Sequence, residues 1–158
     1  MINVTILCVG KLREPFWRDA CAEYTKRLGG RARVVEVEGE HIPEDASPAY
    51  TRAALEREGT RLLARIPKGA ATAALCVEGT AWTSEQLASA LEDWAIGGAG
   101  HAAFRIGSAY GLAPVVKAAA RVRLSLSAMT LPHQLARVVL LEQLYRADRI
   151  LSGGKYHK

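Results

Sequence analysis

The chain has 158 residues, a length typical of one domain, and we expect residues 1–158 to form a single folding unit. Hydrophobic residues make up 49% of the sequence, which is enough to bury a core and excludes a disordered chain. There are 21 Lys and Arg residues against 16 Asp and Glu, so the net charge is +5. A surplus of this size fits a polyanionic partner, and it also fits an ordinary, mildly basic enzyme.

The cysteines and the N-terminal sequence indicate in which cellular compartment the protein is expected. The three cysteines, Cys8, Cys21 and Cys76, are odd in number and far apart, and they form no C-x-x-C motif. The N-terminus lacks the basic region and cleavage site of a signal peptide, and no apolar run reaches the roughly 18 residues of a membrane span. The cysteines and histidines do not have the spacing of zinc ligands. We expect a soluble cytoplasmic protein with buried, reduced thiols, no membrane partner and no metal.

Strands and helices are predicted to alternate along the whole chain. Apolar or alternating runs indicate the strands, whereas first-turn prolines, caps and apolar stripes indicate the helices. The elements are a strand at 3–9, a helix at 15–28, a strand at 33–38, a helix at 48–66, a strand at 72–77, a helix between Thr83 and Gly97, a strand at 102–106, a short helix from about 114, a strand at 123–127 and a helix at 132–150. This alternation predicts a parallel sheet covered on both faces, a single-domain α/β sandwich.

Ligands of such sheets bind outside the carboxyl ends of the strands, where the sequence places unusual turns. These turns are residues 75–79, 106–112 and 127–133. Glycines in the first two either let a ligand approach the backbone or only make tight turns. The chain has no G-x-x-x-x-G-K-[ST], G-x-G-x-x-G or G-x-S-x-G string, which argues against a P-loop enzyme, a Rossmann dehydrogenase and an α/β-hydrolase.

The string from Leu126 to His133 is the most specific in the chain. Small and hydroxyl residues follow a strand, and Pro132 then opens a helix whose free amides can receive a carboxylate or phosphate. His133 lies in the first turn, as either a functional group or a capping or solvated residue. Periodicity alone makes Arg137 a surface or interface residue. Composition alone makes residues 156–158 a solvated tail.

Taken together, several segments resemble the ribosomal RNA large subunit methyltransferase H family. These small SPOUT-class enzymes methylate N3 of a pseudouridine in 23S rRNA. The resemblance extends from the first strand to the last residues, and it is carried by Val9–Lys11, Ile106-Gly107 with Gly111-Leu112, Leu124–His133, Arg137, Glu142–Ala147 and Tyr156-His157.

The resemblance implies a SPOUT-like fold whose C-terminal part threads a trefoil knot, which general topology rules would not predict. It also implies bound S-adenosyl-L-methionine, a homodimer, and a pseudouridine of 23S rRNA presented by the assembled ribosome. Matched positions place the cofactor contacts at Leu75, Gly107, Leu126, Ser127, Ala128, Met129, Thr130 and Leu131. The catalytic candidates are His133, Arg137 and His157, and the substrate-binding candidates are Arg137 and Tyr156.

We expect the C-terminal tail to bind RNA, with Tyr156 as a stacking face and Lys158 as a phosphate contact. The proton on the imide N3 goes to His133 or His157, or to water while Arg137 stabilises the anion. The sequence leaves this choice open. Dimerisation is expected through the last helix, because its apolar positions exceed the stripe that one core-facing side requires. These positions are Leu135, Val138, Val139, Leu141 and Leu144.

The chain departs from the family pattern at two positions. Ser108 stands where the family usually has a second glycine, and Cys76 stands where an acidic residue is common. Cys76 supplies no carboxylate for the cofactor's ribose, and Glu78 is the candidate substitute. Two rival functions remain: a non-catalytic basic α/β module that binds the ribosome, and a SPOUT methyltransferase that acts on another RNA or on a protein.

Overall fold

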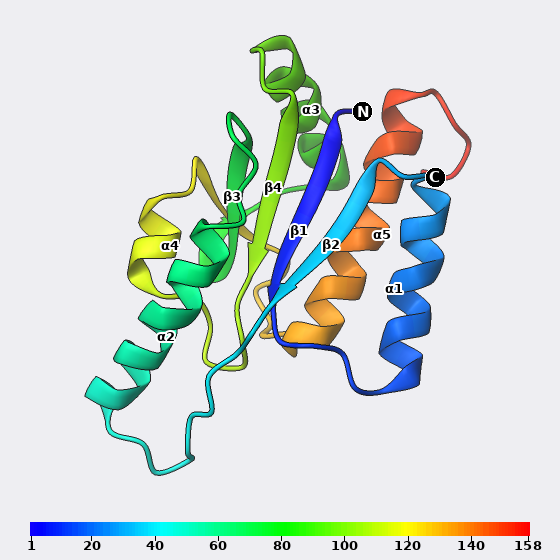
Figure 1. Cartoon of the computed structure of the whole chain (residues 1–158). Helices are drawn as coiled ribbons and strands as arrows, with labels where there is room; N and C mark the ends of the chain where they lie inside the picture. The colour runs from blue at the N-terminus through cyan, green and yellow to red at the C-terminus, as the bar shows by residue number, and fades with distance from the viewer.

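The structure is a computed structural model that describes all residues, 1–158. Five strands and five helices alternate along the chain (Figure 1). They are β1 (Asn3–Val9), α1 (Pro15–Arg27), β2 (Ala32–Val37), α2 (Pro48–Leu63), β3 (Ala71–Ala81), α3 (Ser84–Ile96), β4 (His101–Ile106), α4 (Pro114–Ala118), β5 (Val122–Ser125) and α5 (His133–Leu151). Every predicted element is present, and the ends agree closely except at β3.

The strands form one parallel sheet in the order β2-β1-β4-β3-β5. Helices α1, α5 and α3 pack side by side on one face, and α2 and α4 cover the other (Figure 1). The predicted parallel α/β sheet with both faces covered is therefore confirmed. The trefoil knot stays a prediction.

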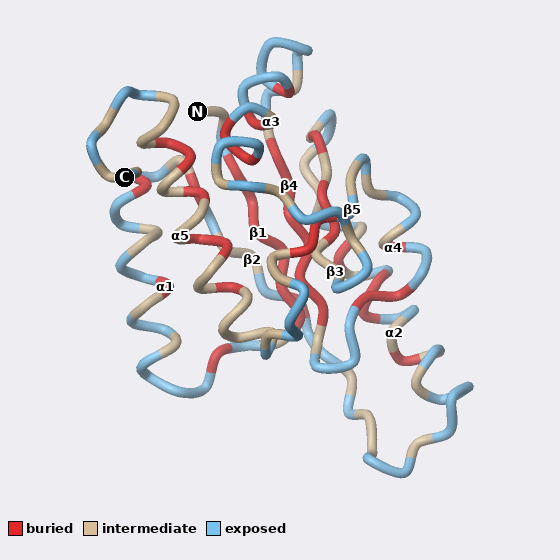
Figure 2. Tube along the Cα trace, turned by 180° about the vertical axis from the view of Figure 1, so that it is seen from behind, coloured by how far each residue is buried: buried red, intermediate tan, exposed pale blue.

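Apolar side chains fill both interfaces between the sheet and its helices. The larger cluster, under α1, α3 and α5, includes Ile6, Phe104 and Leu141, and the smaller one, under α2 and α4, includes Leu7 and Leu62. Figure 2 shows the buried residues concentrated in the central strands, with the outer helix surfaces exposed. Burial of this kind is worth roughly 1.5–3 kcal/mol for each large apolar side chain, and it provides the rigid support for the loops at the carboxyl edge.

Local sequence signals account for the helix starts. The Ser47 hydroxyl accepts a hydrogen bond from the Tyr50 backbone N–H, and Pro48 occupies the first turn of α2. At α3, Thr83 and Gln86 form the predicted capping box, in which each side chain accepts from the other residue's backbone N–H. No helix of the structure combines the length and apolar character needed to cross a membrane.

The third strand differs from its prediction. It was expected at residues 72–77 with a turn after it, but β3 continues to Ala81. Leu124 of β5 pairs with Leu75 and again with Thr80, so the residues between these two form a bulge within the strand. A Cβ on Gly79 would lie 2.7 Å from the carbonyl carbon of Leu124, so only glycine allows the two backbones to approach this closely. The strand-ending turn predicted at Gly79 is therefore wrong, because this glycine lies inside the strand and packs against β5.

Candidate active site

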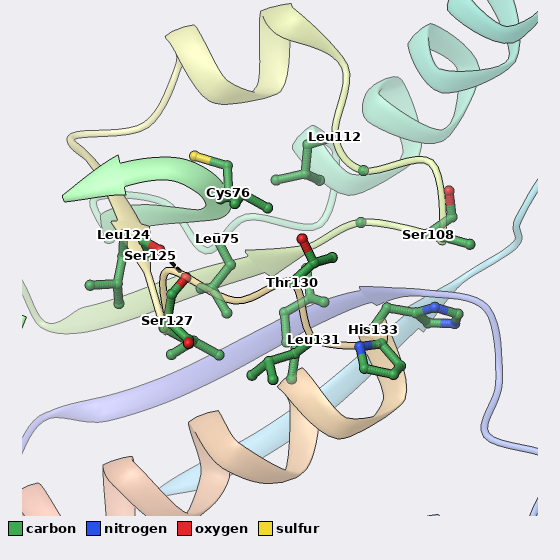
Figure 3. Close-up of a pocket in the computed structure, with 18 of the residues that line it drawn as sticks. Leu75, Cys76, Ser108, Leu112, Leu124, Ser125, Ser127, Thr130, Leu131 and His133 are labelled. Atoms are coloured by element: carbon green, nitrogen blue, oxygen red, sulfur yellow. Dashed lines mark hydrogen bonds between the residues drawn. The ribbon is translucent and has the colours of Figure 1, made fainter. Parts of the chain in front are cut away.

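A cavity of about 770 Å³ opens at the carboxyl edge of the sheet (Figure 3). Residues from all three segments that the sequence predicts as turns contribute to it, although the first of them is the bulge of β3. The lining comes from the β3 bulge, the turn after β4, Lys117 of α4, the end of β5, the loop between β5 and α5, and the first turn of α5. Its size is within the range of small-molecule sites, and apolar and polar side chains share the wall in similar numbers.

Most of the residues expected to contact a cofactor line this cavity. Those in the lining are Leu75, Gly107, Leu126, Ser127, Met129, Thr130 and Leu131. Ala128 is not part of the lining, and the Met129 side chain is 78% exposed, so it lies at the rim. The Ser127 hydroxyl accepts a hydrogen bond from the Met129 backbone N–H at 3.0 Å, which fixes this loop in a tight local turn.

The turn after β4 needs glycine for internal reasons. A Cβ on Gly107 would lie 2.2 Å from the carbonyl oxygen of Gly111, and Gly111 itself has φ +86°. The Gly111 N–H donates to the Ser108 carbonyl oxygen at 2.9 Å and closes the turn. Of the two interpretations that the sequence left open for these glycines, the tight turn explains Gly107, because the missing side chain makes room for the chain's own backbone.

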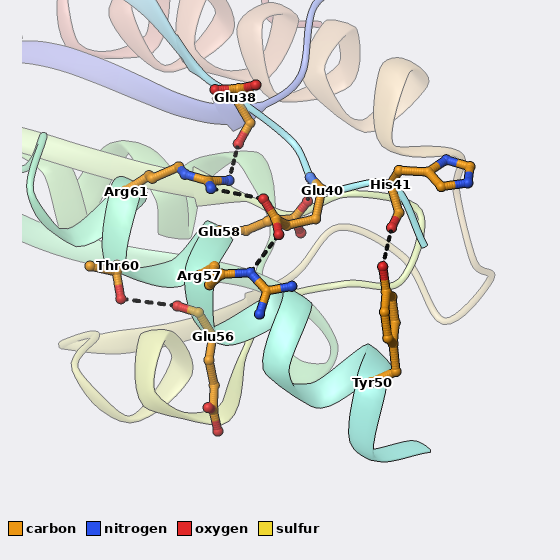
Figure 4. Close-up of polar contacts among 9 residues, drawn as sticks. All are labelled: Glu38, Glu40, His41, Tyr50, Glu56, Arg57, Glu58, Thr60 and Arg61. Carbon is orange, nitrogen blue, oxygen red and sulfur yellow. Dashed lines mark hydrogen bonds and ion pairs between the residues drawn. The ribbon is translucent and has the colours of Figure 1, made fainter. Parts of the chain in front are cut away.

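Glu58 on α2 was missed by sequence reasoning and holds this turn in place. Its side chain is only 2% exposed. Oε1 accepts a hydrogen bond from the Ser108 hydroxyl at 3.1 Å, and Oε2 accepts from the Glu40 backbone N–H at 2.9 Å. Figure 4 shows Glu58 among the polar contacts between α2 and the β2–α2 loop. Ser108, which departs from the family's glycine, thus attaches the turn to α2. The burial of Glu58 could have been predicted from its spacing, because it lies four residues from both Ala54 and Leu62 and so shares their buried face of α2.

The second departure, Cys76, is half-buried in the wall of the cavity rather than in the core with Cys8 and Cys21. Burial raises the pKa of its thiol, so it is uncharged at neutral pH. Glu78 also lines the cavity and forms an ion pair with Lys117. The hydrogen bond from Lys117 lowers the pKa of Glu78, which keeps this carboxylate ionised. No three His, Cys, Asp or Glu side chains converge as metal ligands.

His133 is the first residue of α5 and lines the cavity. Burial is the main cause that lowers its pKa, and the positive charge of Arg137 lowers it further. The imidazole is therefore neutral at pH 7 and has a lone pair available as a proton acceptor. Of the three catalytic candidates, it is the one that reaches the cavity.

Arg137 is buried, which corrects the surface position inferred from periodicity. It is 2% exposed and lies outside the cavity lining. Its Nη1 donates to Glu36 Oε1 at 2.6 Å, and its Nη2 donates to the Gly10 carbonyl oxygen at 3.1 Å. These bonds tie α5, one helical turn after His133, to the ends of β1 and β2. Helix periodicity did not reveal this because both partners come from distant strands.

Comparison with known proteins decides the family. Residues 2–157 match a family model described as "Predicted SPOUT methyltransferase". The chain belongs to the SPOUT methyltransferase family. A relative from Bifidobacterium animalis subsp. lactis, named ribosomal RNA large subunit methyltransferase H, is 46% identical over 99% of this chain and 100% of its own length. A relative of the same name from Listeria monocytogenes is 43% identical over 99% of this chain and 100% of its own length.

A solved structure supports the SPOUT fold. It comes from Bordetella pertussis Tohama I, is described as a probable methyltransferase, and matches with a TM-score of 0.60 and 18% identity over 92% of this chain and 96% of that one. At this identity the likeness concerns the fold alone. SPOUT methyltransferases generally use S-adenosylmethionine as the methyl donor.

In this SPOUT methyltransferase the C-terminal tail packs against its own chain instead of being solvated. The Tyr156 hydroxyl donates to Glu142 at 3.1 Å, and the guanidinium of Arg146 lies 4.8 Å from the Tyr156 ring centre. His157 lies 2.8 Å from Glu85 of α3. The tail follows the far end of α5 (Figure 1), about 28 Å of helix away from His133. Within one chain, therefore, the tail and the cavity do not meet.

Proposed function

We propose that this SPOUT methyltransferase transfers a methyl group from S-adenosyl-L-methionine to N3 of a pseudouridine in 23S rRNA of the assembled ribosome. The single observation that carries the proposal is the meeting of the β3 bulge, the turn after β4, the loop between β5 and α5, and His133 in one cavity. The ribosomal RNA target is supported by the names of relatives that are 46% and 43% identical over 99% of the chain. Because ribosomes are the proposed substrate, the proposed place of action is the cytoplasm.

The chemistry of the cavity fits this cofactor. Apolar Leu75 and Leu131 suit the faces of the adenine ring, and the backbone amides of the Leu126–Leu131 loop suit its edge. The ionised carboxylate of Glu78 is the proposed acceptor for the ribose hydroxyls, in the role that Cys76 cannot fill. When bound, the cofactor supplies a methyl group on a positively charged sulfur.

The protein's contribution is to orient the target base and to remove its proton. Placing the base in line with the methyl group replaces an encounter in solution with a fixed geometry. N3 of the ring must lose a proton to become a nucleophile, and we assign His133 as the acceptor because its imidazole is neutral and reaches the cavity. Arg137 is proposed to hold the start of α5, and hence His133, in position through Glu36 and Gly10.

The functional protein is proposed to be a homodimer of single-domain subunits. Leu135 and Val139 lie one turn apart on α5, are only half-buried, and belong to neither apolar cluster. A second copy would cover this stripe. It would also be the only source of Tyr156, His157 and Lys158 for the cavity, because the chain's own tail is a helix length away. In the dimer we expect Tyr156 to stack on the base and Lys158 to contact a phosphate.

Thermal denaturation tests the cofactor assignment. S-adenosylmethionine at about 100 times its Kd stabilises the folded state by about 2.7 kcal/mol, so the melting temperature rises by several degrees. Replacing Glu78 with Gln weakens that shift, whereas replacing the exposed Glu92 of α3, outside the cavity, does not. A non-catalytic ribosome-binding module predicts no shift for any of these proteins. Methylation of an RNA other than 23S rRNA would contradict the substrate and leave the cofactor assignment intact.

A further inference from the structure

A second hollow, of about 1020 Å³, lies beside the cofactor cavity; we call it the β1–β2 groove. It is lined by residues 10–13 after β1, by Arg18 of α1, and by residues 36–41 at the end of β2. Arg137 connects the linings of the two spaces. It is bonded to Gly10 and Glu36 of the groove, and its helix neighbours His133 and Ala136 line the cavity. A ligand in the groove would therefore lie next to the methyl-transfer site.

The positively charged side chains of this groove form no ion pairs, whereas most of its carboxylates are neutralised by ion pairs. No ion pair involves Lys11, Arg13 or Arg18. By contrast, Glu36 is paired with Arg137, and Glu40 is paired with two arginines of α2 from outside the groove (Figure 4). Glu38 is the one carboxylate of the groove left without a cation. The uncompensated charge is positive, although cations and carboxylates are equal in number in the lining.

The loop after β1 is held in a fixed shape that presents these cations. Arg18 Nη1 donates to the carbonyl oxygens of Leu12 at 3.3 Å and Arg13 at 2.8 Å. Leu12 is buried at 7% exposure and anchors the loop to the core. Lys11 and Arg13, on either side of Leu12, are exposed. Because the backbone of this loop is held in place, only the side chains of Lys11 and Arg13 lose conformational freedom when they bind an anion.

We propose that the β1–β2 groove binds the sugar–phosphate backbone of the RNA strand that flanks the target nucleotide, with Lys11 and Arg13 as phosphate contacts. The inference rests on the proposed RNA methyltransferase function and extends it to a second binding site. Phosphate contacts of this kind fix register and orientation while base contacts specify sequence. The groove thus aligns the RNA so that one nucleotide enters the adjacent cavity.

The test compares two double variants with the same loss of charge. Lys11→Gln/Arg13→Gln removes the groove cations, and Arg65→Gln/Lys68→Gln removes two exposed, unpaired cations between α2 and β3, at the opposite edge of the sheet. The substrate is ribosomes from a strain that lacks the protein. For each protein, kcat/KM and ribosome co-sedimentation are measured across a salt series, and cofactor affinity is measured by calorimetry.

For the groove variant, we expect the slope of log binding against log salt to fall by about two relative to wild type, about one per phosphate contact. Cofactor affinity stays unchanged, and the control variant keeps the wild-type slope. Equal slopes for the two double variants, or a wild-type slope for both, would overturn the groove assignment. An inactive wild-type protein would contradict the proposed function instead, and co-sedimentation would still test the groove.

Discussion

Two buried arginines of this protein differ in whether their charge is compensated. Arg137 has a carboxylate and a carbonyl oxygen as partners. Arg105, on β4 just before the Gly107 turn, is 0% exposed, and none of its three guanidinium nitrogens has a hydrogen-bond partner. Burial lowers the pKa of Arg105. An unpartnered buried cation is among the most costly features that a fold contains.

Replacing Arg105 with Met is therefore expected to stabilise the protein. The substitution keeps an unbranched side chain in the apolar layer under α2 and removes the desolvated charge. Replacing even paired buried ions by apolar residues gains about 1–4 kcal/mol in favourable cases, and each kcal/mol raises the melting temperature of a chain of this length by about 2–4 °C. Thermal denaturation at pH 7 checks this. A lower melting temperature for the variant would mean that Arg105 has a stabilising partner.

At His133 the expected effect is on the pH dependence of the rate. Because its pKa lies below the ordinary value of about 6.5, the neutral, proton-accepting form persists to lower pH than in a free histidine. The rate should therefore rise with pH below about 6.5 and level off by neutrality.

Replacing His133 with Asn should abolish this rise of the methylation rate at acidic pH, which we call the acid limb of the profile. It should also reduce the methylation rate by about 10²–10⁴-fold. His101→Asn is the matched control, because His101 begins β4, at the opposite end of the strand from the Gly107 turn. Single-turnover methylation of ribosomes between pH 5 and 9 gives the profile. If the acid limb persists in His133→Asn, the proton acceptor is another group.

At the scale of elements, the Gly107–Gly111 turn is expected to tolerate no side chain at its first residue. Gly107→Ala places a Cβ against the Gly111 carbonyl oxygen, so the turn must shift. We expect a loss of about 1–3 kcal/mol in stability together with weaker cofactor binding. Gly100→Ala, in the loop before β4, is the control, because a Cβ there meets nothing within 4 Å. Calorimetry with S-adenosylmethionine and thermal denaturation would contradict the account if both variants matched wild type.

The order of elements was predictable from sequence because each has strong local signals. The apolar run of β1, the proline starts of α1 and α2 and the capping box of α3 are contained within a few residues. The bulge of β3 was not predictable, because it depends on how Leu124 of a later strand pairs. A pattern within one segment carries no information about a partner that lies far along the chain.

The site shows the same division between local and distant contacts. The string from Leu126 to His133 marked the loop and helix start that line the cavity, and the structure brings them there. Glu58, by contrast, acts through Ser108, which lies 50 positions away, and Arg137 through Glu36, which lies 101 positions away. Resemblance to a family identified Arg137 as important, but the contacts that explain its burial required the folded structure.

In the homodimer, the distance between the C-terminal tail and the cavity of the same chain predicts that two inactive variants restore each other's methylation activity when they form a mixed dimer. One chain carries His133→Asn with an intact tail, and the other lacks residues 156–158 and keeps His133. If each site combines one cavity with the partner's tail, the mixed dimer has one complete site. Random mixing then restores about a quarter of wild-type activity, since half of the dimers are mixed and have one of two sites intact.

The two chains are co-refolded in equal amounts and assayed together, with each chain alone as the control. Activity no higher than that of the separate chains would mean that the tail acts on its own cavity or not at all. Light scattering on the wild-type protein provides the companion result, with a mass of twice 17.1 kDa expected at micromolar concentration.

The activity proposed for this chain is methylation of N3 of a pseudouridine in 23S rRNA. Mass spectrometry of 23S rRNA nucleosides tests it most directly, in cells that lack the protein and in the same cells complemented with the wild type or with His133→Asn. We expect 3-methylpseudouridine to be absent from the deletion strain, to return with the wild type, and to stay absent or greatly reduced with His133→Asn. Unchanged 3-methylpseudouridine in the deletion strain would contradict it.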